Sequence, residues 1–384
     1  MKIAFLIERL DRSRGGAETY AGDFTRMLVA EGHEVHVFSR CDAVVDKGVT
    51  LRPVPVRGVG RSGHTLSFAR LVEKMLSVEA FDVVHGVGWT VSQDVYQPHG
   101  GVHRATLAAN VRATKCLSRL LKRIGYRLSP KQAVFRRIER RQYLDNPARV
   151  FVALSEMVRR DMQTFYDVPD EKIEVVYNGV DTERFHPHNA ETHRESLRER
   201  YGIGDGEVVF LVVAHNFRLK GVPELVACVT KDLPPCRLVV VGRNRMQKGL
   251  KASAESRAPG RVVFTGAVPD TVPYYAAADV YVHPTYYDPC SLVVLEALAS
   301  GLPVVTSTMN GASELMTDGV EGYVVKPGAG PELAERMHRL FDTPLRNKMG
   351  RAARALAEKH TLRHNYREMM AAYEQVLRRK GLQR

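Results

Sequence analysis

The chain has 384 residues, 44% of them hydrophobic and 26% charged, and a formal net charge of +13 at pH 7. This length suits two domains of ordinary size, and the composition excludes a disordered or fibrous chain. No apolar run reaches the roughly eighteen residues that a membrane-spanning helix needs. The short apolar start after Met1 lacks the pattern of a signal peptide, so we expect a cytoplasmic protein.

The cysteines are scattered and form no Cys-x-x-Cys pair. This pattern indicates a reducing compartment and argues against a structural zinc site. The five are Cys41, Cys116, Cys228, Cys236 and Cys290.

The first half of the chain alternates strand and helix patterns. Short apolar runs predict strands over 2–8, 33–38, 81–86 and 149–154, and helical spacing of apolar residues predicts a helix over 17–31. Near-continuous apolar strands separated by helices are typical of a parallel sheet covered on both faces.

The second half repeats this alternation after a polar joining stretch over 178–206. The sequence therefore predicts an α/β fold with two Rossmann-like domains, 1–178 and 179–364, and a C-terminal helix over 365–384. Parallel sheets bind ligands at the carboxyl ends of their strands, so two such domains are expected to face a ligand across a cleft. Strand patterns in the second half cover 207–213, 237–242, 261–266, 280–283, 303–306 and 322–326.

Two acids stand out in an apolar stretch of the second domain, Asp288 and Glu296. Asp288 before Pro289 can be read as a helix N-cap followed by proline in the first helical turn. Glu296 lies among apolar helix residues and needs a partner, either an arginine or the hydroxyl groups of a ligand such as a ribose. A helix that starts at Cys290 and Ser291 would offer free N–H groups to an anion.

This stretch resembles the nucleotide-sugar motif of retaining glycosyltransferases of the GT-B fold, family four. In that family two glutamates are separated by seven residues and followed by Ala-x-Ala-x-Gly-x-Pro-Val. This sequence has Glu296-Ala-Leu-Ala-Ser-Gly-Leu-Pro-Val304, with Asp288 where the family usually has glutamate. The resemblance covers nearly the whole chain and implies that the C-terminal helix packs back on the first domain. It also implies donor contacts from Pro289, Cys290, Ser291, Leu292 and Glu296.

Other positions of the family follow in turn. Lys220 resembles the lysine that neutralises the donor diphosphate, and Arg218 is a substitute for an arginine that the family more often has earlier. Both can also be read as residues of a solvated loop. Gly15 and Gly16 resemble the family's first loop, where glycine lets the backbone approach a ligand, although a plain tight turn explains them equally well.

Three further sites complete the resemblance. His99 resembles a first-domain histidine near the donor sugar, and Gly242 and Arg243 resemble a loop that borders the nucleotide. Ala267 lies in a loop that resembles the one whose backbone reads the base in the family. His99 and His103 are four residues apart, but the glycines and proline around them argue against a helical metal pair. We therefore expect no metal.

A Gly-x-Gly-x-x-Gly pattern occurs at 58–63. A dinucleotide-binding fingerprint requires a buried strand before it. The preceding residues 51–57 contain two prolines and two arginines, which disfavour a central strand. We interpret the pattern as a mobile loop on the acceptor side.

The positive charge is concentrated between Arg104 and Arg141, where twelve Lys or Arg residues accompany one acid, Glu139. A predicted basic amphipathic helix over 111–128 suits an anionic membrane surface, although its apolar stripe can equally be core. No nucleic-acid-binding module is recognisable, so we expect no nucleic acid partner. We assign the membrane contact to the basic segment Arg112–Arg141. The stripe comprises Leu117, Leu120, Leu121, Ile124 and Leu128.

The resemblance is strongest to the branch of glucosyltransferases that extend the lipopolysaccharide core. It implies transfer of a hexose from a nucleotide sugar, of the UDP-glucose type, to an anionic lipid-linked acceptor at the inner face of the inner membrane. Lys220, Asp288 and His99 are the expected catalytic residues, and no cofactor or metal is expected. A sugar-nucleotide isomerase or hydrolase, or an inactive nucleotide-sugar-binding module, is the alternative on the same fold.

Overall fold

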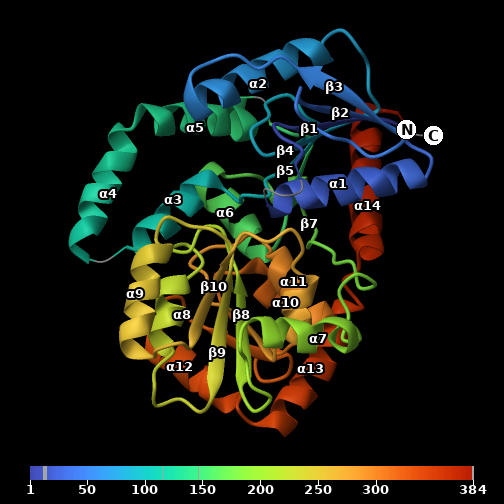
Figure 1. Ribbon diagram of the computed structural model, residues 1–384. Helices are drawn as coiled ribbons and strands as arrows, with labels where there is room; N and C mark the ends of the chain where they lie inside the picture. Colours follow the sequence, from blue (N-terminus) through green and yellow to red (C-terminus); the bar gives the residue numbers. More distant parts are fainter. Residues whose placement is uncertain (12–14, 115, 146, 383–384) are drawn as a thin grey trace. The chain divides into compact units, whose positions relative to one another are not determined.

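The computed structural model describes residues 1–11, 15–114, 116–145 and 147–382 (Figure 1). The chain divides into two compact units, Met1–Asn178 with Leu362–Arg384, and Gly179–Thr361. Each unit has a fully parallel β-sheet with helices between its strands. The predicted α/β class with two Rossmann-like units is confirmed.

The first unit has a seven-stranded sheet in the order β3-β2-β1-β4-β5-β6-β7. The chain proceeds outward in one direction from β1 and then in the other from β4, so the strand order reverses between these two strands. The sequence predicted β1, β2, β4 and β6 but missed the edge strand β3 and the three-residue strands β5 and β7. The bounds are β1 Lys2–Ile7, β2 Glu34–Arg40, β3 Val49–Val54, β4 Val83–Val87, β5 Val95–Gln97, β6 Val150–Ala153 and β7 Ile173–Val175.

The helices of the first unit include the tail of the chain. Helix α14 begins at Leu362 and packs on this unit, where Tyr373 contributes its hydroxyl to a 2.8 Å hydrogen bond with His85 Nδ1 of β4. Residues 383–384 of the predicted tail helix lie outside the described residues. The helices are α1 Gly16–Ala30, α2 Gly60–Leu76, α3 His103–Arg112, α4 Cys116–Leu128, α5 Pro130–Arg140, π-helix η1 Arg141–Asp145, α6 Glu156–Tyr166, 3-10 helix η2 Asp170–Lys172 and α14 Leu362–Lys380.

Two predictions for the first unit are corrected. The helix expected over 111–128 is two helices, because α3 ends at Arg112 and α4 starts at Cys116. The glycine pattern at 58–63 is not a loop throughout, because α2 starts at Gly60. The strand before it, β3, is an edge strand, which is where its proline is tolerated. Lys115 and the side chain of Leu117 lie outside the described residues.

The second unit has a six-stranded sheet in the order β10-β9-β8-β11-β12-β13, with its reversal between β8 and β11. All six strands were predicted from their apolar runs. β-Branched side chains at consecutive positions suit a strand that is buried on both faces, as in the Val-Val-Phe-Leu-Val-Val run of β8. The bounds are β8 Val208–Val213, β9 Cys236–Val241, β10 Val262–Gly266, β11 Val280–His283, β12 Val304–Ser307 and β13 Gly322–Val325.

The helices of the second unit include one within the stretch that was expected only to join the domains. Helix α7 packs on α10, and Arg198 of α7 bonds to Asp279 at 3.3 Å. An N-cap fixes the start of helix α13, where Asp342 Oδ1 accepts a hydrogen bond from Leu345 N at 3.0 Å. The helices are α7 Asn189–Arg200, α8 Val222–Cys228, α9 Gln247–Arg257, α10 Val272–Ala277, α11 Leu292–Ala299, 3-10 helix η3 Gly311–Leu315, α12 Gly330–Arg339 and α13 Thr343–Ala357.

Within the described ranges, no helix is both long and apolar enough to cross a bilayer.

The pairing of β12 with β13 depends on a glycine. Gly322 has φ +148°, and a Cβ at this position would lie 1.9 Å from Val304 O. Gly322→Ala should therefore lower the free energy of unfolding by roughly 3 kcal/mol. The matched control is Gly319→Ala, which should cost about 1 kcal/mol, since Gly319 has φ +84° but a Cβ there would meet no atom within 4 Å. Urea denaturation measures both, and equal losses would contradict the steric argument.

Candidate functional site

The site of the second unit lies where its strand order reverses, between β8 and β11. Side chains of the two loops that leave the carboxyl ends of these strands meet there, as expected for an open parallel sheet. Leu219 O accepts hydrogen bonds from Tyr286 N at 2.7 Å and from Thr285 Oγ1 at 3.0 Å. Gly221 has φ +70°, and a Cβ there would lie 2.2 Å from Pro284 O. The two loops are therefore held together by hydrogen bonds to Leu219 O and by the close backbone approach at Gly221.

This contact places Lys220 beside Asp288. Lys220 Nζ lies 2.5 Å from Asp288 Oδ2, and the side chains are 21% and 13% exposed. Burial alone would raise the pKa of Asp288, but the charge of Lys220 and a hydrogen bond from His283 outweigh it and hold the pKa well below its usual range. The carboxylate is therefore ionised, and the lysine is charged and fixed in place.

His283, the last residue of β11, orients Asp288. Its Nε2 lies 3.2 Å from Asp288 Oδ2, and its Nδ1 lies 3.3 Å from the hydroxyl of Tyr281. Burial lowers the pKa of His283, so the ring is neutral. Val213 N donates to the Tyr281 hydroxyl oxygen, so the Tyr281 O–H is free to donate to His283 Nδ1. The neutral ring then carries its proton on Nε2 and donates it to Asp288 Oδ2. His283 was not predicted as a site residue, and its one signal in the sequence is its place at the end of a strand, directly before Pro284.

The reading of Asp288 as a helix cap is wrong. Helix α11 begins at Leu292 with Ser291 as its N-cap, so Pro289 and Cys290 precede the helix. The backbone of Asp288 instead pairs with a neighbouring loop: its N–H donates to Met309 O at 2.9 Å, and its carbonyl accepts from Gly311 N at 2.8 Å. Its side chain is thereby turned to Lys220 rather than to the helix.

The start of α11 retains unused hydrogen-bond donors. The N–H groups of 292–294 have no acceptor within the helix, as in every first helical turn. The Ser291 hydroxyl is buried and has no hydrogen-bond partner among the described residues. Asn310 Oδ1 accepts from Ser291 N at 3.2 Å and so fixes the chain entering the helix. Such a helix start favours an anion.

Glu296 is positioned by a tyrosine of α10. The hydroxyl of Tyr275 donates to Glu296 Oε2 at 2.8 Å. Burial and the neighbouring carboxylate raise the pKa of Tyr275 far above its usual value, so the tyrosine remains a donor. Glu296 is half-buried, and a carboxylate can accept several hydrogen bonds, so the bond to Tyr275 leaves it able to bind hydroxyl groups of a ligand.

The remaining predicted residues of the second unit lie at the same sheet edge. Gly242 follows β9 with φ +123°, and a Cβ there would lie 1.9 Å from Ala214 O, so only glycine fits. Arg218 is half-buried and Arg243 is exposed, and neither side chain bonds to another described residue. Ala267 is exposed directly after β10. Two free guanidinium groups therefore flank the loops of the Lys220–Asp288 pair.

The predicted residues of the first unit lie at the carboxyl edge of their own sheet. Gly15 is the extended N-cap of α1, with φ 168°, so it is not a tight turn, and Gly16 is the first helical residue. His99 follows β5, and its ring centroid lies 4.2 Å from that of Tyr20. Burial lowers the pKa of His99 to about 3, and its Nε2 has no partner in the described part of the chain.

The structure does not join His99 and His103 as a helical pair. His103 is the first residue of α3, while His99 precedes the helix. His103 Nε2 instead lies 2.7 Å from Gln132 Oε1. Over the described ranges, no group of three or more His, Cys, Asp or Glu residues is placed to hold a metal ion.

Family comparisons divide the chain in the same way as the two sheets. Residues 193–356 match the family described as "Glycosyl transferases group 1", and residues 14–184 match "Glycosyltransferase Family 4". Lipopolysaccharide glucosyltransferase WaaG of Escherichia coli K12 is 26% identical over 350 residues, covering 88% of this chain and 91% of the relative. D-inositol 3-phosphate glycosyltransferase of Corynebacterium aurimucosum is 28% identical, covering 88% and 86%.

Solved structures support the same fold. The crystal structure of WaaG has a TM-score of 0.81 at 24% identity and covers 96% of this chain and 98% of that chain. Anabaena Alr3699/HepE in complex with UDP and glucose has a TM-score of 0.71 at 19% identity, covering 97% and 99%. The two α/β units are those of the GT-B fold, as the resemblance in the sequence implied.

The Lys220–Asp288 pair generates a prediction about stability. Lys220→Met should lower the free energy of unfolding by roughly 3 kcal/mol at pH 7, because it leaves a largely buried carboxylate without its counter-charge. The pKa of Asp288 is depressed in the folded state, so the stability it provides is present above the unfolded carboxyl pKa of 3.8 and is lost as the pH falls further. The deficit of the variant should therefore shrink below about pH 4.

Thermal unfolding of the wild type, Lys220→Met and the double variant Lys220→Met/Asp288→Asn between pH 3 and pH 7 tests this prediction. The double variant should be more stable than Lys220→Met at pH 7 because it has no unpaired charge. A deficit that is equal at all pH values would contradict the ion pair.

Proposed function

The chain belongs to the group 1 glycosyltransferases of family 4, and we propose that it moves a hexose from a nucleotide diphosphate sugar of the UDP-glucose type to a lipid-linked glycan such as lipopolysaccharide core. The observation that carries the proposal is the Lys220 ammonium held by Asp288, in the loop that leads into α11, at the strand-order reversal of the second sheet. Similarity to the glucosyltransferase WaaG supports the sugar and the acceptor, and the UDP complexes of Alr3699/HepE support a uridine nucleotide.

In this proposal the leaving diphosphate binds to positive groups that are already in place. Lys220 and the N–H groups of 292–294 hold the phosphates, Arg218 and Arg243 flank them, and Glu296 accepts the ribose hydroxyl groups. Preorganised positive groups stabilise the charge that develops on a departing diphosphate without reorganisation at the moment of reaction. No metal or other cofactor is needed in this scheme, since the lysine and the helix start provide the positive charge.

Asp288 acts in two ways in the proposal. Its Oδ2 holds Lys220 and accepts from His283. Its Oδ1 has no hydrogen bond to any described side chain, and is available to a hydroxyl group of the donor sugar. The carboxylate is one methylene shorter than the usual glutamate of the family, and the backbone pairing of Asp288 with Met309 and Gly311 turns it to Lys220.

The chemical step breaks the bond between the anomeric carbon and the diphosphate oxygen. The acceptor hydroxyl oxygen forms a new bond to that carbon on the same face, which gives retention. The acceptor's proton passes to the departing phosphate, so that the products are the glycosylated acceptor and the nucleoside diphosphate.

The surface of α4 supports a lipid acceptor and a membrane-associated protein. The sequence left open whether its apolar stripe is core, and the structure excludes this for the four described residues, which are 45% to 77% exposed. The side chains of Arg123 and Arg127 are also exposed and bond to no described residue, whereas Lys122 Nζ donates to Asn110 O at 2.6 Å. The exposed stripe consists of Leu120, Leu121, Ile124 and Leu128.

A groove of about 430 Å³ borders the same helix in the first unit and contains no acid in its lining. An apolar surface with arginines at its border suits an amphiphilic anion. The proposed location of the protein is the cytoplasm, peripherally on the inner face of the inner membrane. The groove is lined by Arg104, Leu107, Ala108, Val111, Arg123, Tyr126, Arg127, Arg136 and Phe165.

A donor and acceptor screen tests the transfer. The wild type is incubated with labelled nucleotide sugars, with and without native and dephosphorylated lipid acceptors. Product is expected only with an acceptor, and best with UDP-glucose and the phosphorylated lipid. Release of free sugar or an epimer without acceptor would favour a hydrolase or isomerase, and tight nucleotide binding without turnover would favour an inactive binding module.

Variants in the screen separate the proposed roles. Lys220→Met should reduce kcat about 100-fold to 1,000-fold, because it removes one fixed positive group from the departing diphosphate. Glu296→Gln should mainly raise KM for the donor, because the ribose contact is made before and during transfer. An unchanged kcat in Lys220→Met, with the fold intact by circular dichroism, would contradict the role of the lysine.

The membrane surface has its own prediction. The triple variant Leu120→Ser/Leu121→Ser/Ile124→Ser and the double variant Arg123→Glu/Arg127→Glu should each bind at least tenfold less to vesicles of phosphatidylglycerol and phosphatidylcholine. Affinity for UDP should not change. Val78→Ser, at a position that is 83% exposed outside α4, is the control for loss of an apolar surface side chain. Wild-type vesicle binding by both α4 variants would remove the membrane assignment.

A further inference from the structure

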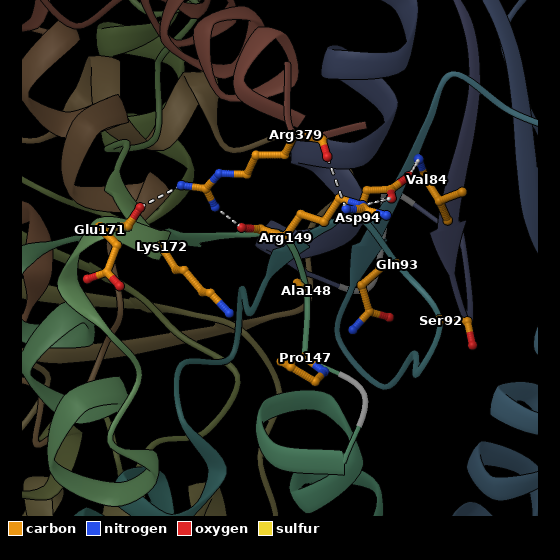
Figure 2. Close-up of a pocket in the computed structure, with 10 residues that line it drawn as sticks. All are labelled: Val84, Ser92, Gln93, Asp94, Pro147, Ala148, Arg149, Glu171, Lys172 and Arg379. Atoms are coloured by element: carbon orange, nitrogen blue, oxygen red, sulfur yellow. Dashed lines mark hydrogen bonds and ion pairs between the residues drawn. The ribbon is translucent and has the colours of Figure 1, made fainter. Parts of the chain in front are cut away.

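A second cavity lies in the first unit at the amino edge of its sheet (Figure 2). Its volume is about 710 Å³, a size that holds one small metabolite. Gly15 and His99 lie at the opposite, carboxyl edge of the same sheet, so this cavity is separate from the residues proposed to act on the donor. It is lined by Val84 of β4, by the residues that precede three strands, and by α14: Ser92, Gln93, Asp94, Pro147, Ala148, Arg149, Glu171, Lys172 and Arg379.

The walls of the cavity carry fixed positive charge. Arg379 donates to the carbonyl oxygens of Glu171, at 2.6 Å, and of Arg149. Carbonyl groups are neutral, so these bonds fix the guanidinium without cancelling its charge. Asp94 is shared by two cations, Arg149 at 3.3 Å and Lys380 at 2.6 Å. Cations therefore outnumber carboxylates in and around the cavity. The cations are Arg149, Lys172, Arg379 and Lys380, and the carboxylates are Asp94 and the exposed Glu171.

Two side chains of the lining have unused hydrogen-bonding capacity. Gln93 is 9% exposed, and neither its Oε1 nor its Nε2 has a hydrogen-bond partner among the described residues. A buried amide without partners is costly and rare in folded proteins. Lys172 is half-buried, and its ammonium group bonds to no described residue. Figure 2 shows Lys172 and Gln93 extending on either side of Ala148.

We propose that this cavity binds a phosphorylated polyol, with the phosphate on Lys172 and Arg149 and the hydroxyl groups on the amide of Gln93. Lysine and arginine supply charge-assisted donors to phosphate oxygens. A hydroxyl group both donates and accepts, so it satisfies the carbonyl oxygen and the amino group of a primary amide together. The apolar part of the lining, Val84, Pro147 and Ala148, is too small for an acyl chain. The ligand is therefore distinct from the nucleotide sugar and from the lipid.

Calorimetric titration of the full chain tests the proposal with three probes. Glucose 6-phosphate should bind at least tenfold more tightly than inorganic phosphate, and glucose should not bind measurably at the same concentrations. Lys172→Gln should weaken binding of both phosphate-containing probes at least tenfold. Lys348→Gln, a substitution of an exposed lysine on α13, is the matched control and should change neither.

Gln93→Met separates the ligand contact from damage to the fold. It should weaken glucose 6-phosphate binding at least tenfold and leave inorganic phosphate binding unchanged. It should also raise the melting temperature of the ligand-free protein, because it removes an unsatisfied buried amide. Equal affinity of the wild type and Lys172→Gln for glucose 6-phosphate would overturn the proposal, as would a melting temperature lowered by Gln93→Met with unchanged sugar phosphate binding.

Titration with UDP provides an independent readout. Loss of binding at one proposed site should leave binding at the other unchanged, since the residues of the two sites lie in different units of the chain. Absence of UDP binding with normal glucose 6-phosphate binding would contradict the proposed function alone.

Discussion

The ion pair between Lys220 and Asp288 is the interaction on which the account of the site depends. It bridges the loops after β8 and β11, the two strands between which the order of the second sheet reverses. Because a parallel sheet opens a crevice at such a reversal, a charged group held there is exposed to a ligand without belonging to the core. Hydrogen bonds that Leu219 O accepts from Tyr286 N and from the Thr285 hydroxyl fix the spacing of the loops, so the pair does not depend on the flexible Lys220 side chain alone.

The rest of the site is built outward from this pair. Tyr281 and His283 of β11 form a buried hydrogen-bond chain that fixes the Asp288 carboxylate. Tyr275 of α10 fixes Glu296 of α11 by a hydrogen bond. The result is one held cation, two held carboxylates and an open helix start along a single sheet edge. This set of groups suits a ligand that carries a diphosphate and several hydroxyl groups, which is the chemistry of a nucleotide sugar.

The sequence revealed those parts of the molecule that have a local signal. Apolar runs predicted every strand of the second sheet, while β5 and β7 have three residues each and were too short to recognise. The resemblance to the family motif pointed to Lys220, Asp288 and Glu296 as candidate site residues. It gave no sign of Tyr275 or His283, since a single aromatic residue in a buried segment is most often core. Asp288 was misread as a cap because its pairing with Met309 and Gly311 is set by tertiary structure rather than by its neighbours in sequence.

A crystal structure of the full chain with bound UDP tests the central claim most directly. The account predicts phosphate oxygens within hydrogen-bonding distance of Lys220 Nζ and of the N–H groups of 292–294, with the ribose hydroxyl groups on Glu296. A structure in which the phosphates lie away from both groups, while Lys220 remains bonded only to Asp288, would contradict it.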